Sequence, residues 1–171
     1  MIKGITGAPL DMSDVISNGT SILQHFSFLD PYLWRDQQKN ADLHDQKKSH
    51  SNLSVIPRDA LKFLDQEISR AIQIRNGQKV PILVIECKNS EGLINYLDAI
   101  AKQIPNQRSD HFFIEQYNQH IIRQLPVKNL AALLFGDIAK DLPEGYYSSF
   151  ENYVLMSPNL PVLKEFLSDI L

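Results

Sequence analysis

Residues 67–88 read EISRAIQIRNGQKVPILVIECK, and the fold of this stretch sets the interpretation of its neighbours. Its second half, residues 80–87, is a nearly continuous apolar run rich in β-branched residues, which is typical of a strand covered on both faces. The Asn76-Gly77 pair before it has two interpretations. It is the preferred loop of a two-residue β-hairpin, and it is equally suited to end a helix, because glycine tolerates left-handed backbone angles.

The two interpretations give different structures for residues 57–75. As a helix end, the pair terminates a helix that Pro57 opens and whose apolar stripe includes Leu61, Leu64 and Ile68. As a hairpin loop, it places a strand at residues 67–75. We favour the helix, because the stripe begins at Leu61 and continues without a break. The hairpin stays open as the alternative.

Apolar periodicity predicts further elements towards the C-terminus. Ser90 is a suitable N-cap for the next helix and Pro105 stops it. We expect helices over residues 90–104, 130–138 and 162–170, and strands over residues 111–117, 120–125 and 147–156. Because helices and strands interleave, the sequence predicts an α/β or α+β fold: a single domain with a mixed sheet flanked by helices and with an N-terminal aromatic arm.

The composition is that of an ordinary globular domain. The chain has 171 residues, of which 43% are hydrophobic and 22% charged. Its 17 Lys and Arg residues against 20 Asp and Glu residues give a net charge of −3, so the basic excess of a general nucleic-acid binder is missing. No apolar run reaches the ~18–20 residues that span a bilayer, and the first residues lack the apolar stretch of a signal peptide. We therefore expect no membrane insertion and a cytoplasmic location.

Three regions differ in composition along the chain. Residues 36–54 are mostly polar and cannot bury enough surface to offset the entropy of ordering them. We therefore divide the chain into an N-terminal aromatic arm (1–35), a polar linker or long loop (36–54) and a compact body (55–171).

A short charged motif follows the apolar strand. Glu86 and Lys88 are two residues apart, so in a strand they place a carboxylate and an ammonium on one face. If the preceding loop is a hairpin, counting back from it places Glu67 opposite Glu86 and Asp65 opposite Lys88. Like charges in opposition are destabilising unless a cation lies between them, and Mg²⁺ or Mn²⁺ held by Glu67, Glu86 and Asp65 would meet that need.

This hairpin resembles the core of the PD-(D/E)xK nuclease superfamily, in which an acid on one strand meets an E-x-K on the next. The resemblance covers residues 65–88: Glu86 and Lys88 match the E-x-K, Glu67 or Asp65 matches the first acid, and no Pro-Asp pair precedes the first strand. It implies a metal-dependent nuclease or phosphodiesterase with Glu86, Lys88 and Glu67 as catalytic residues and Lys88 polarising the scissile phosphate. The alternative interpretation is that Glu86 and Lys88 are solvated residues where a core strand leaves the sheet.

Cysteine and histidine indicate no second site. The single cysteine, Cys87, excludes internal disulfides and fits a reducing compartment. By alternation its side chain lies on the face of Leu83 and Ile85, where a free cysteine is usually an inert small hydrophobe. The histidine spacings match no zinc pattern; the histidines are His25, His44, His50, His111 and His120.

The N-terminal arm concentrates large apolar side chains in residues 22–34. Thr20 or Ser21 is placed to cap a short helix there, which Asp30-Pro31 would break. Aromatic residues dominate the energetics of protein interfaces, so we interpret the arm as a docking segment. The predicted partner-binding residues are Phe26, Phe28, Tyr32 and Trp34. The alternative is that the arm folds back onto the body as an extra core element.

The sequence therefore favours a non-catalytic protein–protein interaction module that needs no cofactor and whose partner is another protein. An adaptor, an assembly subunit and an immunity- or chaperone-like partner all fit this description. The alternative is the metal-dependent nuclease, with Mg²⁺ or Mn²⁺ as its cofactor. The oligomeric state does not follow from these patterns.

Overall fold

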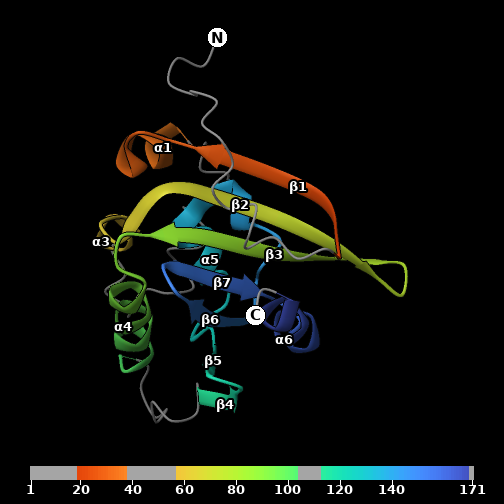
Figure 1. Cartoon of the computed structure of the whole chain (residues 1–171). Helices are drawn as coiled ribbons and strands as arrows, with labels where there is room; N and C mark the ends of the chain where they lie inside the picture. The colour runs from red at the N-terminus through yellow and green to blue at the C-terminus, as the bar shows by residue number, and fades with distance from the viewer. Residues whose placement is uncertain (1–18, 38–56, 104–112, 170–171) are drawn as a thin grey trace.

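The computed structural model describes residues 19–37, 57–103 and 113–169, and its centre is a β-sheet (Figure 1). The sheet has seven strands in the order β1-β2-β3-β7-β6-β5-β4. Every pair of neighbouring strands is antiparallel, so the mixed sheet expected from the sequence is wrong and the fold is α+β. The predicted linker, residues 36–54, lies almost entirely outside the described residues, as do His44, His50 and His111.

The elements follow a simple order along the chain. The strands are β1 (Thr20–Ser27), β2 (Leu64–Arg75), β3 (Gln78–Cys87), β4 (Phe113–Tyr117), β5 (His120–Gln124), β6 (Tyr146–Phe150) and β7 (Tyr153–Ser157). The helices are α1 (Pro31–Gln37), α3 (Pro57–Leu61), α4 (Ser90–Ala101), α5 (Leu130–Phe135), the 3-10 helix η3 (Gly136–Ala139) and α6 (Leu160–Asp169). Each of the hairpins β2–β3, β4–β5 and β6–β7 is followed by a helix. The three hairpins account for the antiparallel pairing of β2 with β3, of β4 with β5 and of β6 with β7.

The favoured helix over residues 57–75 is wrong. Helix α3 ends at Leu61, and β2 begins three residues later. Asn76 and Gly77 have φ angles of 52° and 76°, the positive values that a two-residue hairpin loop requires. Arg75 pairs with Gln78, so the hairpin that was the alternative interpretation is confirmed.

The predicted strand over residues 147–156 is a hairpin of two shorter strands. The chain reverses at Glu151, whose φ is 49°, and Phe150 pairs with Tyr153 across the turn. Strand β3, the β4–β5 hairpin and helix α6 agree with the prediction. Helix α4 does too, except that Asn89 caps it: the Asn89 side chain accepts a hydrogen bond of 2.7 Å from the backbone N–H of Gly92.

The two faces of the sheet bury two separate apolar cores. Helices α1, α3, α4 and α5 pack on one face, where β3 contributes Leu83, Ile85 and Cys87. Helix α6 covers part of the other face, where β3 contributes Ile82 and Val84. The continuous apolar run of β3 follows from this arrangement, because every residue of a strand covered on both sides is buried.

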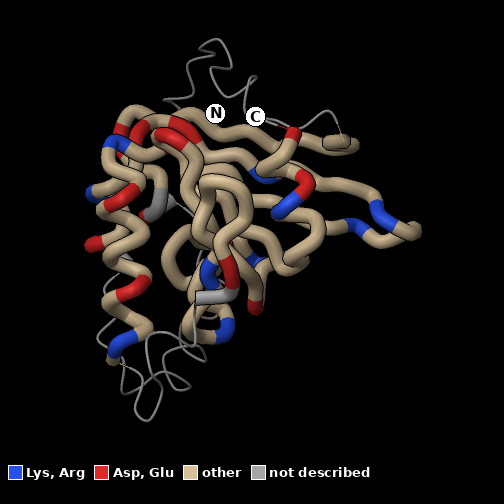
Figure 2. Tube along the Cα trace, turned by 60° about the horizontal axis from the view of Figure 1, so that its bottom comes forward, with Lys and Arg blue, Asp and Glu red and all other residues tan. Residues whose placement is uncertain are grey.

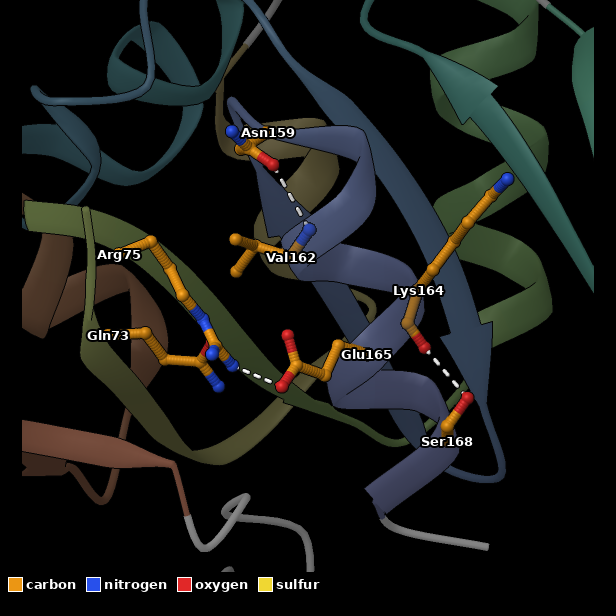
Figure 3. A network of polar contacts seen from close by, with 7 residues as sticks. All are labelled: Gln73, Arg75, Asn159, Val162, Lys164, Glu165 and Ser168. Atoms are coloured by element: carbon orange, nitrogen blue, oxygen red, sulfur yellow. Dashed lines mark hydrogen bonds and ion pairs between the residues drawn. The ribbon is translucent and has the colours of Figure 1, made fainter. Parts of the chain in front are cut away.

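Helix α6 is held against the β2–β3 hairpin by polar contacts (Figure 3). The guanidinium of Arg75 forms an ion pair with Glu165 and also donates to Gln73 at 3.3 Å. At the start of the helix, the Asn159 side chain accepts a 3.0 Å hydrogen bond from the Val162 backbone N–H. The Arg75–Glu165 ion pair therefore joins α6 to the hairpin near its loop, whereas the Asn159 contact caps the helix itself.

The described part of the N-terminal region belongs to the sheet and its core. Thr20 and Ser21 lie in β1, so the short helix that they were expected to cap is wrong. Pro31 begins α1 instead of breaking a helix, and the Asp30 side chain accepts a hydrogen bond of 2.8 Å from the Tyr32 N–H. Within the described ranges, no helix is long and apolar enough to cross a membrane.

Candidate functional site

Strand β1 is an edge strand of the sheet. It pairs antiparallel with β2, from Thr20 opposite Gln73 to Ser27 opposite Glu67, and no other strand in the described ranges pairs with it. Just beyond its end, the Phe28 N–H donates to the Gln66 carbonyl at 2.8 Å. Since alternate residues of a strand direct their N–H and C=O groups to opposite sides, the backbone groups of Leu23, His25 and Ser27 lie on the outer edge.

Both faces of β1 carry exposed apolar side chains. Ile22 and Phe26 lie on the face that also carries the α1 side of the core, and Leu23 lies on the opposite face; all three are exposed. The strand sequence, TSILQHFS, contains no Lys, Arg, Asp or Glu. In Figure 2, where Lys and Arg are blue and Asp and Glu are red, the whole of β1 is therefore tan. An edge strand without charge or proline lacks the usual protection against pairing with another chain.

Helix α1 and the turn before it extend this apolar surface. Leu29 is 74% exposed and Leu33 is 62% exposed, and Tyr32 between them is also exposed. Elsewhere in the described part of the chain, the large apolar side chains that are exposed are Ile74 and Ile121. We call the following set the β1–α1 surface: Ile22, Leu23, Phe26, Leu29, Tyr32 and Leu33.

The predicted partner-binding residues divide between this surface and the core. Phe26 and Tyr32 are on the β1–α1 surface, whereas Phe28 and Trp34 are each only 7% exposed. The rings of Phe28 and Trp34 stack on each other and pack with the residues of α3, α4 and α5. A partner that docks on the folded protein therefore meets Phe26 and Tyr32, and it does not reach Phe28 or Trp34.

The prediction of binding residues from aromatic side chains did not include the two most exposed residues of the β1–α1 surface. Leu29 and Leu33 were not among the predicted binding residues, yet they are more exposed than either aromatic residue of the surface. Leu33 lies in α1, and Leu29 lies in the turn just before that helix. Because Asp30-Pro31 was expected to break a helix, a helix that begins at Pro31 and exposes Leu33 was not predicted.

A polar cluster lies beside Leu23 on the second face of the edge strands. The Nδ1 atom of His25 is 2.7 Å from Ser69 Oγ, and its Nε2 atom is 3.0 Å from Ser27 Oγ and 3.7 Å from Glu67 Oε1. Glu67 and Ser69 are buried. Burial lowers the pKa of His25 below its ordinary value, because the charged imidazolium is poorly solvated there. This cluster joins β1 to β2 through side chains as well as backbone.

The acidic residues expected to oppose each other are separated by an irregularity in β2. Pairing follows the predicted count from Arg75 to Ile68, which lies opposite Ile85, but Leu64 lies opposite Cys87. The shift between these two pairs makes the predicted opposition of Glu67 to Glu86 wrong. Glu67 lies beside His25, while a carboxylate oxygen of Glu86 is 3.4 Å from the Gln66 backbone nitrogen.

The ends of the two strands hold the other residues of the predicted metal site. Asp65 is half-buried at the start of β2, and Lys88 is exposed directly after β3. In the part of the chain that the structure describes, no group of three or more His, Cys, Asp and Glu side chains is arranged to hold a metal ion. The catalytic and metal-binding roles of Glu67, Glu86, Asp65 and Lys88 stay predictions.

The chain was compared with protein families, curated proteins and solved structures. None of them matches it. The functional conclusion therefore depends on the geometry of the molecule itself, and the β1–α1 surface is its most distinctive exposed feature.

The single cysteine, Cys87, is in an environment that makes its thiol unreactive. Cys87 is buried in the core on the α1 side of the sheet. Burial, together with the nearby carboxylates of Glu86 and Asp65, which repel a thiolate, raises the pKa of its thiol to about 12. A nucleophilic role needs an exposed thiolate, so the geometry agrees with the inert core residue expected from the sequence.

Proposed function

We propose that this protein is a non-catalytic interaction module of the cytoplasm that binds an extended segment of a partner protein along the outer edge of β1. The observation that supports the proposal is the edge itself: an eight-residue strand with no charged residue and with apolar side chains exposed on both faces. Natural proteins normally protect such edges with lysine, proline or short strands. A long, unprotected edge is what strand addition requires.

Strand addition explains the role of each part of the surface. The outward N–H and C=O groups of Leu23, His25 and Ser27 would pair with the partner backbone, and the side chains of Ile22 and Phe26 would pack against alternate partner side chains. Phe26 and Tyr32 have the side-chain types that most often dominate interface energetics. Leu29 and Leu33 would extend the contact beyond the strand.

Two matched substitutions test the proposal. Ile22 is 42% exposed on β1 and Ile121 is 41% exposed on β5, so Ile22→Lys and Ile121→Lys make the same chemical change inside and outside the surface. Both variants are first shown to fold by circular dichroism. We then measure recovery of partner proteins from an extract of the source cells, followed by hydrogen exchange of the β1 amides in the purified complex.

We expect the wild type and Ile121→Lys to recover the same protein and Ile22→Lys to lose it. In the complex, the amides of Leu23, His25 and Ser27 should exchange more slowly than in the free protein. Recovery that is unchanged by Ile22→Lys, or protection confined to other strands, would contradict strand addition at β1.

The metal-dependent nuclease is the alternative function, and the β2–β3 hairpin supports it by supplying the strand it requires. Its test is a calorimetric titration with Mn²⁺ of the wild type and of Glu86→Ala, together with an assay for cleavage of plasmid DNA. Saturable binding and cleavage that both disappear in Glu86→Ala would favour the nuclease. No saturable Mn²⁺ binding by the wild type, or cleavage that is unchanged in Glu86→Ala, would contradict the nuclease.

A further inference from the structure

We infer that the strand added to β1 is β1 of a second copy of this chain, so that two copies pair edge to edge about a twofold axis perpendicular to the sheet. This inference rests on the proposed function and names the partner for the same edge. Such pairing is antiparallel and continues the sheet of one copy into the sheet of the other, with corresponding faces on the same side.

Charge is the first reason to choose a second copy. Each chain has a net charge of −3, so two copies repel each other overall. Strand β1 has no charged residue, and self-pairing therefore places no like charges opposite each other. The edge needs an uncharged extended strand with alternating apolar side chains as its partner, and β1 itself meets this description.

Register is the second reason. If the twofold axis passes between Gln24 of one copy and Gln24 of the other, Ile22 of each copy lies opposite Phe26 of the other. Pairs of an aromatic and a β-branched residue are among the favourable cross-strand pairs. An axis at Leu23 would instead place Ile22 opposite Gln24, and an axis at His25 would place Phe26 opposite Gln24. The axis at Gln24 alone joins the two exposed apolar residues of that face.

The outward-facing backbone groups of β1 fit the same register, with the axis at Gln24. The groups of Leu23 and His25 lie on the outer edge, so Leu23 of one copy and His25 of the other would form hydrogen-bonded pairs on both sides of the axis. The two Gln24 residues would then form a non-hydrogen-bonded pair, in which the side chains are closest. Beyond the strand, Leu29 and Leu33 of each copy enlarge the apolar area. Because one strand pair is small compared with a standard interface, we expect a reversible dimer whose population rises with concentration.

Cysteine cross-linking tests this register directly. The thiol of the single native cysteine, Cys87, is buried, so an introduced cysteine is the reactive one. We expect Gln24→Cys to form a disulfide-linked dimer under mild oxidation, because the two side chains of a non-hydrogen-bonded pair are almost within disulfide distance. Ile74→Cys, exposed at the other end of the neighbouring strand β2, is the matched control and should form no disulfide-linked dimer.

Sedimentation equilibrium over a range of concentrations gives the second measurement. We expect the wild type and Ile121→Lys to dimerise with equal affinity, and we expect Ile22→Lys to weaken dimerisation by about tenfold, because the substitution places a lysine opposite Phe26 twice in each dimer. A monomeric wild type at high concentration, or equal cross-linking of Gln24→Cys and Ile74→Cys, would overturn the inference.

The two proposals fail in different ways. A monomeric wild type that still recovers a different protein through β1 contradicts the second copy and keeps the interaction module. A dimer whose formation is insensitive to Ile22→Lys contradicts pairing through this edge. If Ile22→Lys still dimerises and still recovers the partner protein, both proposals are contradicted.

Discussion

The ring of Phe28 stacks on the ring of Trp34, with their centroids 4.9 Å apart and their planes inclined by 21°. This contact joins the residue that follows β1 to the middle of α1, and it orients the helix against the sheet. The exposed Leu29 and Leu33 lie between these buried rings in the sequence. The same stretch of chain therefore provides both an anchor in the core and an exposed apolar surface.

We predict that Phe28→Ala and Trp34→Ala each lower the free energy of unfolding by about 3–5 kcal/mol, because each removes a buried aromatic ring. Urea denaturation measures the change. Leu29→Ala is the control, and its effect should stay within about 0.5 kcal/mol, since that side chain is exposed. Small effects for the aromatic substitutions would mean that α1 does not depend on the stack.

Cys87 should be unreactive in the folded protein. Its pKa of about 12 leaves a thiolate fraction about a thousandfold below that of an exposed thiol at neutral pH, and burial also blocks access. A thiol-specific reagent at pH 8 should modify the folded chain very slowly and the urea-unfolded chain rapidly. Fast stoichiometric modification of the folded chain would contradict this prediction.

Asp98 should couple energetically to Tyr147. The buried Tyr147 hydroxyl donates to Asp98 Oδ1 at 2.8 Å, while Arg123 Nε lies 3.2 Å from Asp98 Oδ2. Burial raises the pKa of Tyr147, and the Asp98 carboxylate raises it further, so the hydroxyl keeps its proton. We expect Asp98→Ala to cost about 1–3 kcal/mol, because it leaves this hydroxyl without its acceptor.

Tyr147→Phe removes the hydroxyl together with its need for an acceptor. The double variant Asp98→Ala/Tyr147→Phe should therefore lose less stability than the sum of the two single variants. A double-mutant cycle by urea denaturation measures the difference. Strict additivity would show that the contact contributes nothing specific.

The environment of His25 should make stability fall in mild acid. The pKa of His25 is lowered in the folded protein, so below about pH 6.5 the unfolded chain binds a proton that the folded chain resists. The groups that face the ring are Ser27, Ser69 and Glu67. We expect His25→Gln to reduce the loss of stability between pH 7.5 and 5.5, measured by urea denaturation. An identical pH dependence in the variant would contradict this role for His25.

Gly77→Ala should destabilise the hairpin by about 1 kcal/mol. A Cβ at Gly77 would meet no atom within 4 Å, so the cost arises from the φ angle of +76°, which alanine adopts reluctantly. Thermal unfolding measures the change. An unchanged or raised melting temperature would contradict the requirement for a glycine at this turn.

The β2–β3 hairpin shows why the sequence was ambiguous. Leu64, Ile68 and Ile72 are spaced by four, and a spacing of four returns to the same face in a strand as well as in a helix. The stripe was therefore compatible with both structures. The Asn-Gly pair was the feature that distinguished the hairpin from the helix. The helix was favoured because the apolar stripe continued back to Leu61, but Leu61 belongs to the separate short helix α3.

The candidate site was predicted only in part for a related reason. The arm was recognised from its aromatic residues, but aromatic character does not distinguish a buried ring from an exposed one. Whether Phe26 or Phe28 is buried depends on the register between β1 and β2 and on where α1 begins. Likewise, counting from the hairpin loop correctly placed Ile68 opposite Ile85. The register shift between Leu64 and Ile68 was not predicted, because residues 65–67 contain no sequence feature that indicates it.

The strand order has a consequence for synthesis of the chain. Strand β3 is an interior strand of the sheet, yet its second neighbour is β7, and Leu83 pairs with Met156. At ordinary rates of translation, β3 waits roughly 4–15 s for that neighbour to be made. During this interval a strand that is covered on both faces in the folded protein has one open edge. A chain that stops before residue 153 should therefore aggregate when it is released. Pairing of the last hairpin, β6–β7, with β3 is the step that covers this open edge.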